Sequence, residues 1–292
     1  MILSLLVVNY NTESYICDLL QDLLAQTLPT DQWQVVIVNN SRNDQLQIMV
    51  RRFQSLLSCT IIQSPQNVGF GRAMNLAAEH AQGELLLLMN PDMRMLQDDY
   101  LEKLLEHAQQ NPEFGVISTQ VLDDDGQDVS TYHYYEFGQT LGYDNQICWF
   151  QGSLMLMDAD VFTKMGGFDT DFFMYCEDVD LCYRLKKSGK PLLKYEALKI
   201  YHYGGASEPS RGLDFYLKYF KSRWLFAHKH LTPADFQALL ENQNHKAKNR
   251  VRFYGVLRLL SQHYVEKYNK NLATRIIITK IQTESADWLY QK

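Results

Sequence analysis

The sequence predicts an α/β protein with a mostly parallel sheet flanked by helices, followed by a helical C-terminal region. Three observations carry this prediction. Short apolar runs alternate with segments of helical periodicity in the first third of the chain. A polar cluster follows several of these runs, and helical spacing alone continues beyond Arg211. We therefore expect two parts, an α/β domain over residues 1–210 and a basic, mainly helical region over residues 211–292.

Four buried strands are expected in the first third of the chain. Each is a near-continuous apolar run, which indicates a strand that is buried on both faces. The segments between them carry apolar residues three or four positions apart, as on one face of a helix. The four strands are expected at residues 2–8, 33–38, 60–63 and 85–89. Such alternation implies right-handed crossovers and a parallel sheet.

The middle of the chain is less regular. Strands are expected at residues 115–121 and 152–157, and a helix at residues 179–187. Residues 199–203 are expected to close the core as a strand or a loop. The segment 132–143 is rich in tyrosine and glycine, which indicates an ordered surface loop or a lid.

Composition limits the class of protein. Hydrophobic residues make up 46% and charged residues 21% of the 292 residues, as in ordinary soluble proteins. The five cysteines are scattered and form no C-x-x-C pair, so we expect no zinc knuckle and no disulfide framework, and a reducing, cytoplasmic setting. We also expect no signal peptide and no membrane-spanning segment, because no apolar run approaches the length of about 18 residues that a span needs.

Charge is unevenly distributed along the chain. Residues 211–292 carry 15 Lys and Arg against 6 Asp and Glu, whereas residues 1–210 carry 13 against 28. One interpretation of the basic part is a solvated face on helices that pack against the first domain. Another is an amphipathic surface that contacts the inner face of the cell membrane. No nucleic-acid-binding module is recognisable, so nucleic acid is not expected as a partner. The aromatic residues of this part also suit a homodimer interface.

Three short motifs carry candidate chemistry. Asn90 and Asp92 flank a proline directly after a buried strand, where a carboxylate suits a divalent cation that also holds a diphosphate. The same tripeptide is a good turn sequence. Glu177 and Asp178 precede a predicted helix, either as acids favoured by the helix N-terminus or with one of them as a general base. His202 ends a strand-like run and is either structural or a metal ligand.

A glycine-rich segment at residues 67–75 follows the third expected strand. It resembles a phosphate-binding loop but has neither the G-x-G-x-x-G order nor a P-loop lysine. A dinucleotide-dependent dehydrogenase is therefore disfavoured. Arg72 within this segment remains a candidate phosphate ligand.

Taken in order, these segments resemble the family 2 glycosyltransferases. The resemblance covers roughly residues 2–207 and is strongest for the bacterial branch that makes rhamnosyl and related transfers to surface polysaccharides. The motifs that carry it stand in the family's order at residues 7–11, 23–27, 38–41, 67–71, 88–92, 166–169, 177–181 and 202–206.

The resemblance implies a GT-A fold and an inverting, metal-assisted transfer from a nucleotide-diphosphate sugar. It implies Asp178 as the general base, with Glu177 beside it, and Mg²⁺ or Mn²⁺ held by Asp92 and His202. The implied donor contacts are Val8, Tyr10, Asn11, Asn39, Arg72, Asn90 and Asp92. The implied acceptor contacts are Trp149, Gln151 and Gly152.

Two departures from the family pattern affect these expectations. Asn39 stands where the family usually has an aspartate that contacts the base or ribose, so base recognition is expected to differ or weaken. The metal motif is N-P-D rather than D-x-D, which leaves Asp92 as its one acidic ligand.

The expected function is transfer of rhamnose or a similar sugar from a dTDP- or UDP-linked donor. The expected acceptor is a hydroxyl of a growing bacterial surface polysaccharide or of a lipid-linked oligosaccharide. One alternative is a sugar-nucleotide nucleotidyltransferase, which should have a glycine- and Arg/Lys-rich loop after the first strand. The other is a catalytically silent protein that binds nucleotide sugars or acts as a scaffold.

Overall fold

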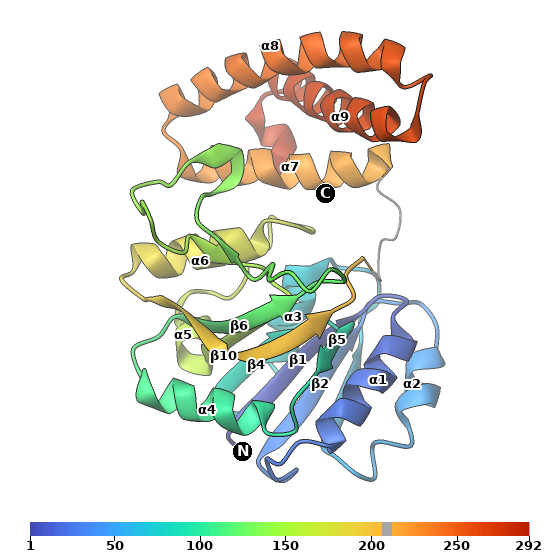
Figure 1. Ribbon diagram of the computed structural model, residues 1–292, viewed down its shortest axis with the longest axis vertical. Coiled ribbons are helices and arrows are strands. Elements are labelled where there is room, and N and C mark those ends of the chain that lie inside the picture. Colours follow the sequence, from blue (N-terminus) through green and yellow to red (C-terminus); the bar gives the residue numbers. More distant parts are fainter. Residues whose placement is uncertain (206–211, 292) are drawn as a thin grey trace. The chain divides into compact units, whose positions relative to one another are not determined.

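The computed structural model describes residues 1–205 and 212–291 (Figure 1). Of these, residues 1–170 and 177–205 form one unit, and residues 171–176 and 212–291 form a second. The boundary expected between residues 210 and 211 lies outside the described residues. The grouping of residues 171–176 with the C-terminal helices was not foreseen, because a helix and a strand of the first unit separate this segment from them in sequence.

The first unit contains an eight-stranded sheet of order β3-β2-β1-β4-β9-β6-β10-β5. Its first four strands confirm the predicted parallel arrangement, with Leu6 of β1 opposite Val36 of β2 and Leu88 of β4. Every residue of β1 and β2 is buried, as the continuous apolar runs predicted. These strands are β1 (Leu3–Asn9), β2 (Trp33–Asn39), β3 (Cys59–Gln63) and β4 (Leu85–Met89).

The other half of the sheet is mixed. β9 (Leu154–Asp158) lies antiparallel between β4 and β6 (Val116–Leu122), and β5 (Met93–Met95) lies antiparallel to β10 at the edge. β10 (Leu192–His202) is much longer than the strand or loop expected at residues 199–203. Its register against β6 shifts between Tyr195 and Lys199, and it carries Lys, Tyr and Glu on its accessible side. This bulge and these polar residues interrupt the apolar pattern that reveals the other strands.

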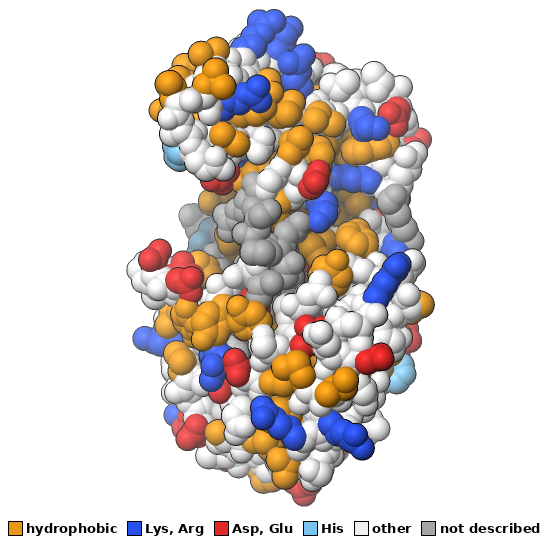
Figure 2. Space-filling model, turned by 90° about the vertical axis from the view of Figure 1, so that its right-hand side faces the viewer, with side chains coloured by type: hydrophobic (Ala, Val, Ile, Leu, Met, Phe, Trp, Pro, Cys, Tyr) orange, Lys and Arg blue, Asp and Glu red, His pale blue; other side chains and the backbone are white. Residues whose placement is uncertain are grey.

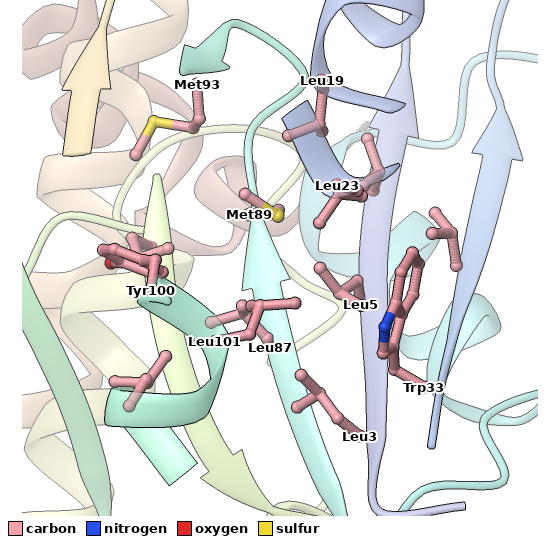
Figure 3. Packing of buried hydrophobic residues seen from close by; sticks show 14 of the residues in the cluster. Leu3, Leu5, Leu19, Leu23, Trp33, Leu87, Met89, Met93, Tyr100 and Leu101 are labelled. Carbon is pink, nitrogen blue, oxygen red and sulfur yellow. The ribbon is translucent and has the colours of Figure 1, made fainter. Parts of the chain in front are cut away.

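Two layers of helices cover the sheet (Figure 1). Residues of β1 alternate between them, since Leu5 packs in the layer of α1 and α4 whereas Leu6 packs in that of α3 and α6. Figure 3 shows the first layer, where Leu23 and Leu101 approach the strand residues Leu5 and Leu87. Each such fully buried side chain stabilises the fold by about 1.5–3 kcal/mol. The helices are α1 (Glu13–Leu24), α2 (Gln45–Val50), α3 (Phe70–Ala78), α4 (Tyr100–Gln110), α5 (Ala159–Lys164) and α6 (Glu177–Lys187).

A small hairpin stands apart from the main sheet. β7 (Thr131–Tyr132) pairs antiparallel with β8 (Trp149–Phe150), and a short 3₁₀ turn, η1 (Glu136–Gly138), lies between them. The tyrosine-rich segment expected as an ordered loop or lid is therefore the connection within this hairpin.

The second unit is helical, as predicted. It consists of α7 (Leu213–His230), α8 (Pro233–Leu257), α9 (Gln262–Glu284) and the 3₁₀ turn η2 (Ala286–Tyr290). The longest of these helices, α8, has 25 residues. Thr232 begins this helix by accepting a hydrogen bond from Asp235 N–H, and a proline follows at the first helical position. Within the described residues, no helix has the length and apolar character needed to cross a bilayer.

Candidate active site

The carboxyl ends of β1, β2 and β3 carry a network of amide and hydroxyl side chains. Asn9 donates from Nδ2 to Asn39 Oδ1 at 2.8 Å and to Ser41 Oγ at 3.2 Å. Asn39 in turn donates to Gln63 Oε1 at 2.8 Å, while Gln63 Nε2 donates to the carbonyl oxygens of Asn39 and Ser41. These strand ends meet because the three strands are parallel neighbours. The network makes this edge of the sheet polar and well connected.

Asn39, expected to contact the base or ribose, lies inside this network. Only 2% of it is exposed, and its Oδ1 also accepts from Ser41 N–H at 3.1 Å. Both polar atoms of the side chain therefore have protein partners. An aspartate here would turn a carboxylate oxygen toward Gln63 Oε1, which would place two acceptors together without a proton. The amide at position 39 thus suits its neighbours.

Three other candidate donor contacts lie at or beside this edge. Val8 is buried near the end of β1, Tyr10 is half-buried and Asn11 is exposed. Asn11 has a φ of 56°, a left-handed conformation that asparagine tolerates better than most residues. Its N–H donates to Ser41 Oγ at 2.7 Å, which joins the turn after β1 to the turn after β2.

Arg72, expected as a phosphate ligand, makes its hydrogen bonds to a different partner in the structure. Its guanidinium donates from Nε to the Thr170 carbonyl at 2.9 Å, and from Nη2 to the same oxygen. Asn75, one turn further along α3, bonds both the N–H and the carbonyl of Phe168. Together these side chains hold the segment that leads toward α6.

Asp92 and His202, the two expected metal ligands, lie side by side. Asp92 follows β4, and His202 ends β10, which pairs with the β5 residue directly after Asp92. His202 Nε2 is 3.3 Å from Asp92 Oδ1 and 3.4 Å from Asn90 Nδ2. Both side chains are buried. The edge pairing of β5 with β10 therefore brings together residues that are remote in sequence.

This pair has a geometry that fits two ligands of one divalent cation. Two ligand atoms about 2.1 Å from an ion and at right angles lie about 3.0 Å apart, close to the separation seen here. No third His, Cys, Asp or Glu joins the pair anywhere in residues 1–205 and 212–291. A cation on these two residues would therefore keep coordination positions for other oxygen atoms, of the kind that a diphosphate supplies.

Asp178 lies half-buried at the start of α6, and backbone groups hold its carboxylate. Gly152 N–H donates to Oδ2 at 2.7 Å, and Val179 N–H donates to Oδ1 at 2.8 Å. A Cβ atom at position 152 would lie 3.1 Å from the Asp178 Cβ, so a glycine permits this close approach. Because Gly152 bonds Asp178, the strand expected from residue 152 begins only at Leu154.

Asn90 and Ser153 connect the Asp92–His202 pair to the loop that holds Asp178. Asn90 N–H donates to the Ser153 carbonyl at 2.9 Å, and its side chain approaches His202. Ser153 directly follows the glycine that bonds Asp178. The structure therefore gathers Asp92, His202 and Asp178 at one end of the sheet, around the loop that precedes β9.

Burial raises the pKa values of the two acidic residues that begin α6. It raises the pKa of Glu177 to about 8, and the charge of Asp178 adds to this effect. Burial also raises the pKa of Asp178 to about 6, against the hydrogen bonds from Gly152 and Val179 and with a further contribution from the Glu136 charge. Near neutral pH, Asp178 is thus mostly ionised and Glu177 mostly protonated. An ionised carboxylate that is more basic than usual is suited to accept a proton.

The β7–β8 hairpin places an aromatic surface beside Asp178. Trp149, an expected acceptor contact, stacks on Tyr132 with ring centroids 3.8 Å apart. β8 packs against α6, whose second residue is Asp178, and burial and then the Asp178 charge raise the pKa of Tyr132. Gln151, another expected acceptor contact, donates its N–H to the Ser130 carbonyl at 3.1 Å. The hairpin therefore presents a flat surface next to the candidate base.

Sequence reasoning missed three residues of this region. Tyr132 and Glu136 fall within the segment interpreted as a loop or lid, and no local motif relates them to Asp178. Ser153 contributes through its carbonyl oxygen, which any residue type supplies, so its identity carries no signal. Tyr132 stacks on Trp149, whereas Tyr134, two residues later, is exposed. The sequence around these two tyrosines does not distinguish them.

Comparison with known proteins identifies relatives over most of the chain. The family model described as "Glycosyl transferase family 2" matches residues 4–180. Rhamnosyltransferase WbbL of Escherichia coli (strain K12) is 26% identical over 226 residues, which are 68% of this chain and 82% of WbbL. An N-acetylglucosaminyl-diphospho-decaprenol L-rhamnosyltransferase of Mycobacterium tuberculosis is 23% identical over 64% of this chain and 72% of its own length. The match to TarS of Staphylococcus aureus, 33% identical over 101 residues, spans only 17% of that longer protein.

Solved structures share the fold. A mannosyltransferase, PcManGT from Pyrobaculum calidifontis in complex with GDP-Man and Mn²⁺, superposes with a TM-score of 0.63 at 18% identity, covering 97% of this chain and 87% of the other. TarS residues 1–349 in complex with UDP-GlcNAc superposes with a TM-score of 0.58 at 16% identity, covering 97% and 92%. These neighbours are GT-A glycosyltransferases, and the expected GT-A fold is confirmed.

Proposed function

The chain belongs to glycosyl transferase family 2, and from this premise we propose that it is an inverting, metal-assisted glycosyltransferase that moves rhamnose or a similar sugar. The proposed donor is a dTDP- or UDP-linked sugar. The proposed acceptor is a hydroxyl of a growing bacterial surface polysaccharide or of a lipid-linked oligosaccharide. Two rhamnosyltransferases among the relatives support the choice of sugar. A cytoplasmic location is part of the same proposal.

The observation that carries the proposal is the backbone-held carboxylate of Asp178, which Gly152, Ser153 and Asn90 connect to the Asp92–His202 pair. The Gly152 N–H bond fixes Oδ2 of Asp178 on the side of the loop that also contacts Asn90. A base with a pKa of about 6 is ionised at neutral pH yet more basic than an ordinary aspartate. These features suit a group that takes a proton from an acceptor hydroxyl during bond formation.

The proposed reaction is a single displacement. Asp178 accepts the proton of the acceptor hydroxyl while the oxygen of that hydroxyl attacks the anomeric carbon. The bond between the anomeric carbon and the diphosphate oxygen breaks, and the nucleoside diphosphate leaves with the bonding electrons. Attack from the face opposite the diphosphate inverts the anomeric configuration. General-base help of this kind contributes about 10²–10⁴-fold to the rate.

Asp92 and His202 are the residues that would hold Mg²⁺ or Mn²⁺ in this proposal. Their oxygen and nitrogen donor atoms suit such a cation, and their 3.3 Å separation fits two neighbouring ligands. When bound, the cation neutralises charge on the donor diphosphate. Asn90 supports the pair by bonding both the His202 side chain and the loop that carries Gly152.

On the acceptor side, we assign the stacked rings of Tyr132 and Trp149 to sugar contact. An aromatic surface offers a large apolar area to the C–H face of a sugar ring. Its position next to Asp178 would hold an acceptor hydroxyl within reach of the carboxylate. Glu177, mostly protonated at neutral pH, adds no second negative charge beside the base.

A donor screen with a variant of the base tests the proposal. The purified protein is incubated with dTDP-rhamnose or UDP-GlcNAc, a saccharide acceptor and Mn²⁺, and nucleoside diphosphate release and the anomeric configuration of the product are measured. Asp178→Asn is expected to lower transfer by at least about 10²-fold while donor binding by calorimetry stays within about twofold. Asp160→Asn, at a side chain that is 87% exposed, is the matched control.

Four results would contradict the proposal. Near-normal turnover by Asp178→Asn would exclude it as the base, and a product of retained configuration would exclude the single displacement. Donor binding without transfer or hydrolysis would support a catalytically silent protein. Release of pyrophosphate from a nucleoside triphosphate and a sugar 1-phosphate would instead indicate a nucleotidyltransferase.

A further inference from the structure

The turn between α8 and α9 exposes large apolar side chains. We call residues 246–270, which include the end of α8, the turn and the start of α9, the hairpin tip. The exposed fractions are 61% for Phe253, 69% for Val256, 82% for Leu259 and 74% for Leu260. Contiguous apolar side chains in water are unfavourable, and they commonly mark a surface that another body covers.

Basic residues surround these apolar side chains. The hairpin tip contains seven Lys and Arg against one acidic residue, Glu266. Glu266 Oε1 accepts a hydrogen bond from Tyr216 at 2.6 Å, so this carboxylate is already engaged within the unit. On the face that Figure 2 shows, hydrophobic and basic side chains lie side by side over the C-terminal unit. The basic residues are Lys246, Lys248, Arg250, Arg252, Arg258, Lys267 and Lys270.

Tyrosines of the hairpin tip contact its basic side chains. The Arg258 guanidinium stands 4.2 Å from the ring centroid of Tyr268, and Lys267 Nζ stands 5.8 Å from that of Tyr254. Tyrosine has an apolar ring and a polar hydroxyl, and it is favoured where hydrocarbon meets water. The hairpin tip therefore combines the three residue classes of an interfacial segment, apolar, aromatic and basic.

We propose that the hairpin tip docks on an anionic phospholipid bilayer. Leu259 and Leu260 enter the boundary between headgroups and acyl chains, and the basic side chains contact lipid phosphates. The charge of the tip argues against its covering by a second copy, because two tips of net +6 would repel each other. The four apolar side chains argue against nucleic acid, because nucleic acid would engage the basic residues and leave the apolar side chains in water. The docking rests on the proposed function only for its purpose, which is access to a lipid-linked acceptor.

Vesicle co-sedimentation of the full-length protein tests the docking. The probes are phosphatidylcholine vesicles with and without phosphatidylglycerol, at low and at high salt. Wild-type protein is expected to bind the anionic vesicles at low salt and to be released by salt, which screens the charges. Arg250→Gln with Arg252→Gln is expected to weaken binding about 25-fold, since each basic residue near the surface contributes about fivefold.

The apolar contribution is tested separately. Leu259→Ser with Leu260→Ser is expected to weaken binding at least about tenfold, because two exposed leucines would lose their place in the membrane. Both positions are exposed, so folding is not expected to change. The matched control, Ile48→Ser with Leu56→Ser, removes two exposed apolar residues from the first unit, 72% and 57% exposed. The control for charge is Arg51→Gln with Lys187→Gln, two exposed basic residues of the first unit.

The vesicle and sedimentation outcomes bear on the docking alone. No binding of wild type to anionic vesicles at low salt overturns it, and so does equal loss in the tip variants and their controls. Sedimentation velocity without vesicles distinguishes self-association, because a wild-type dimer that Leu259→Ser with Leu260→Ser dissociates, with vesicle binding unchanged, assigns the surface to a second copy. Transfer to a soluble acceptor is measured in parallel. Absence of transfer by the wild-type protein would oppose the proposed function, whereas vesicle binding would still report on the docking.

Discussion

Glu177→Gln should make the protein more stable at neutral pH, although it alters a residue beside the proposed base. Glu177 is 5% exposed, and within the described residues its buried Oε2 has no hydrogen-bond partner. Burial raises the pKa of this carboxyl from an ordinary value of 4.5 to about 8. A buried acid of this kind is a cost to folding that a neutral amide of the same shape avoids.

The size of this cost follows from proton linkage. Between pH 4.5 and pH 8 the unfolded chain ionises Glu177 while the folded protein keeps it protonated, so stability falls as the pH rises through this window. The carboxyl costs less than about 1 kcal/mol at pH 5, on the order of 3 kcal/mol at pH 7 and somewhat more at pH 8.5. Glu177→Gln removes the dependence. The variant and the wild type should therefore be similar at pH 5 and differ by a few kcal/mol at pH 8.5.

Urea unfolding at pH 5, 7 and 8.5, followed by circular dichroism, measures the difference. Glu79→Gln, at an exposed glutamate that follows α3, is the matched control and should follow the wild type at each pH. The reasoning is refuted if Glu177→Gln loses as much stability as the wild type between pH 5 and pH 8.5. It is refuted also if the variant is the less stable protein at pH 8.5, since the carboxylate would then have a favourable partner.

Three further predictions concern the reaction. The logarithm of kcat/KM should rise with pH up to about 6 and then level off, because Asp178 must be ionised to accept a proton. The Glu136 charge raises the pKa of Asp178, so Glu136→Gln should move the rising limb to lower pH. A limb at unchanged pH in that variant would contradict the link between the two carboxyls. Gly152→Ala should lower kcat about tenfold with donor affinity unchanged, because the new methyl group displaces Asp178 by a few tenths of an ångström, and steady-state kinetics would detect it. Asp92→Asn and His202→Gln should each raise the Mn²⁺ concentration needed for half-maximal transfer at least about tenfold, and a metal titration with the same half-maximum as wild type would remove these residues as ligands.

Much of the first unit could be predicted from sequence because burial leaves a local pattern. A strand covered on both faces must be apolar at nearly every position, and β1 and β4 are recognisable for this reason. The polar residues that follow such strands were recognisable as candidate site residues, since parallel strands end at one edge of the sheet. The length of β10 was underestimated because its accessible positions carry polar residues and its register against β6 shifts. The local pattern of apolar residues therefore no longer reflects the strand pairing.

Hydrogen bonds between segments that are distant in sequence could not be predicted in the same way. Base recognition that differs or weakens at Asn39 stays a prediction, but the bonds of Asn39 to Asn9 and Gln63 were not foreseen, because they depend on three strands lying side by side. The role of Arg72 as a phosphate ligand stays a prediction, but its bond to the Thr170 carbonyl, which joins residues 98 positions apart, was not foreseen. Neither partner can be inferred from the residues that flank Asn39 or Arg72 in sequence.

The sequence by itself determined the fold class, the order of the strands along the chain, the basic C-terminal region and the identities of Asp92, Asp178 and His202 as candidates. Only the tertiary structure decided that Asp92 meets His202, that Gly152 holds Asp178, and that burial makes Asp178 more basic. Periodicity records whether each position faces water, which is a local property of a strand or helix. Hydrogen bonds between distant segments and the desolvation of a carboxyl depend on which surfaces the sheet order and the loops bring together, and these exist only once the chain has folded.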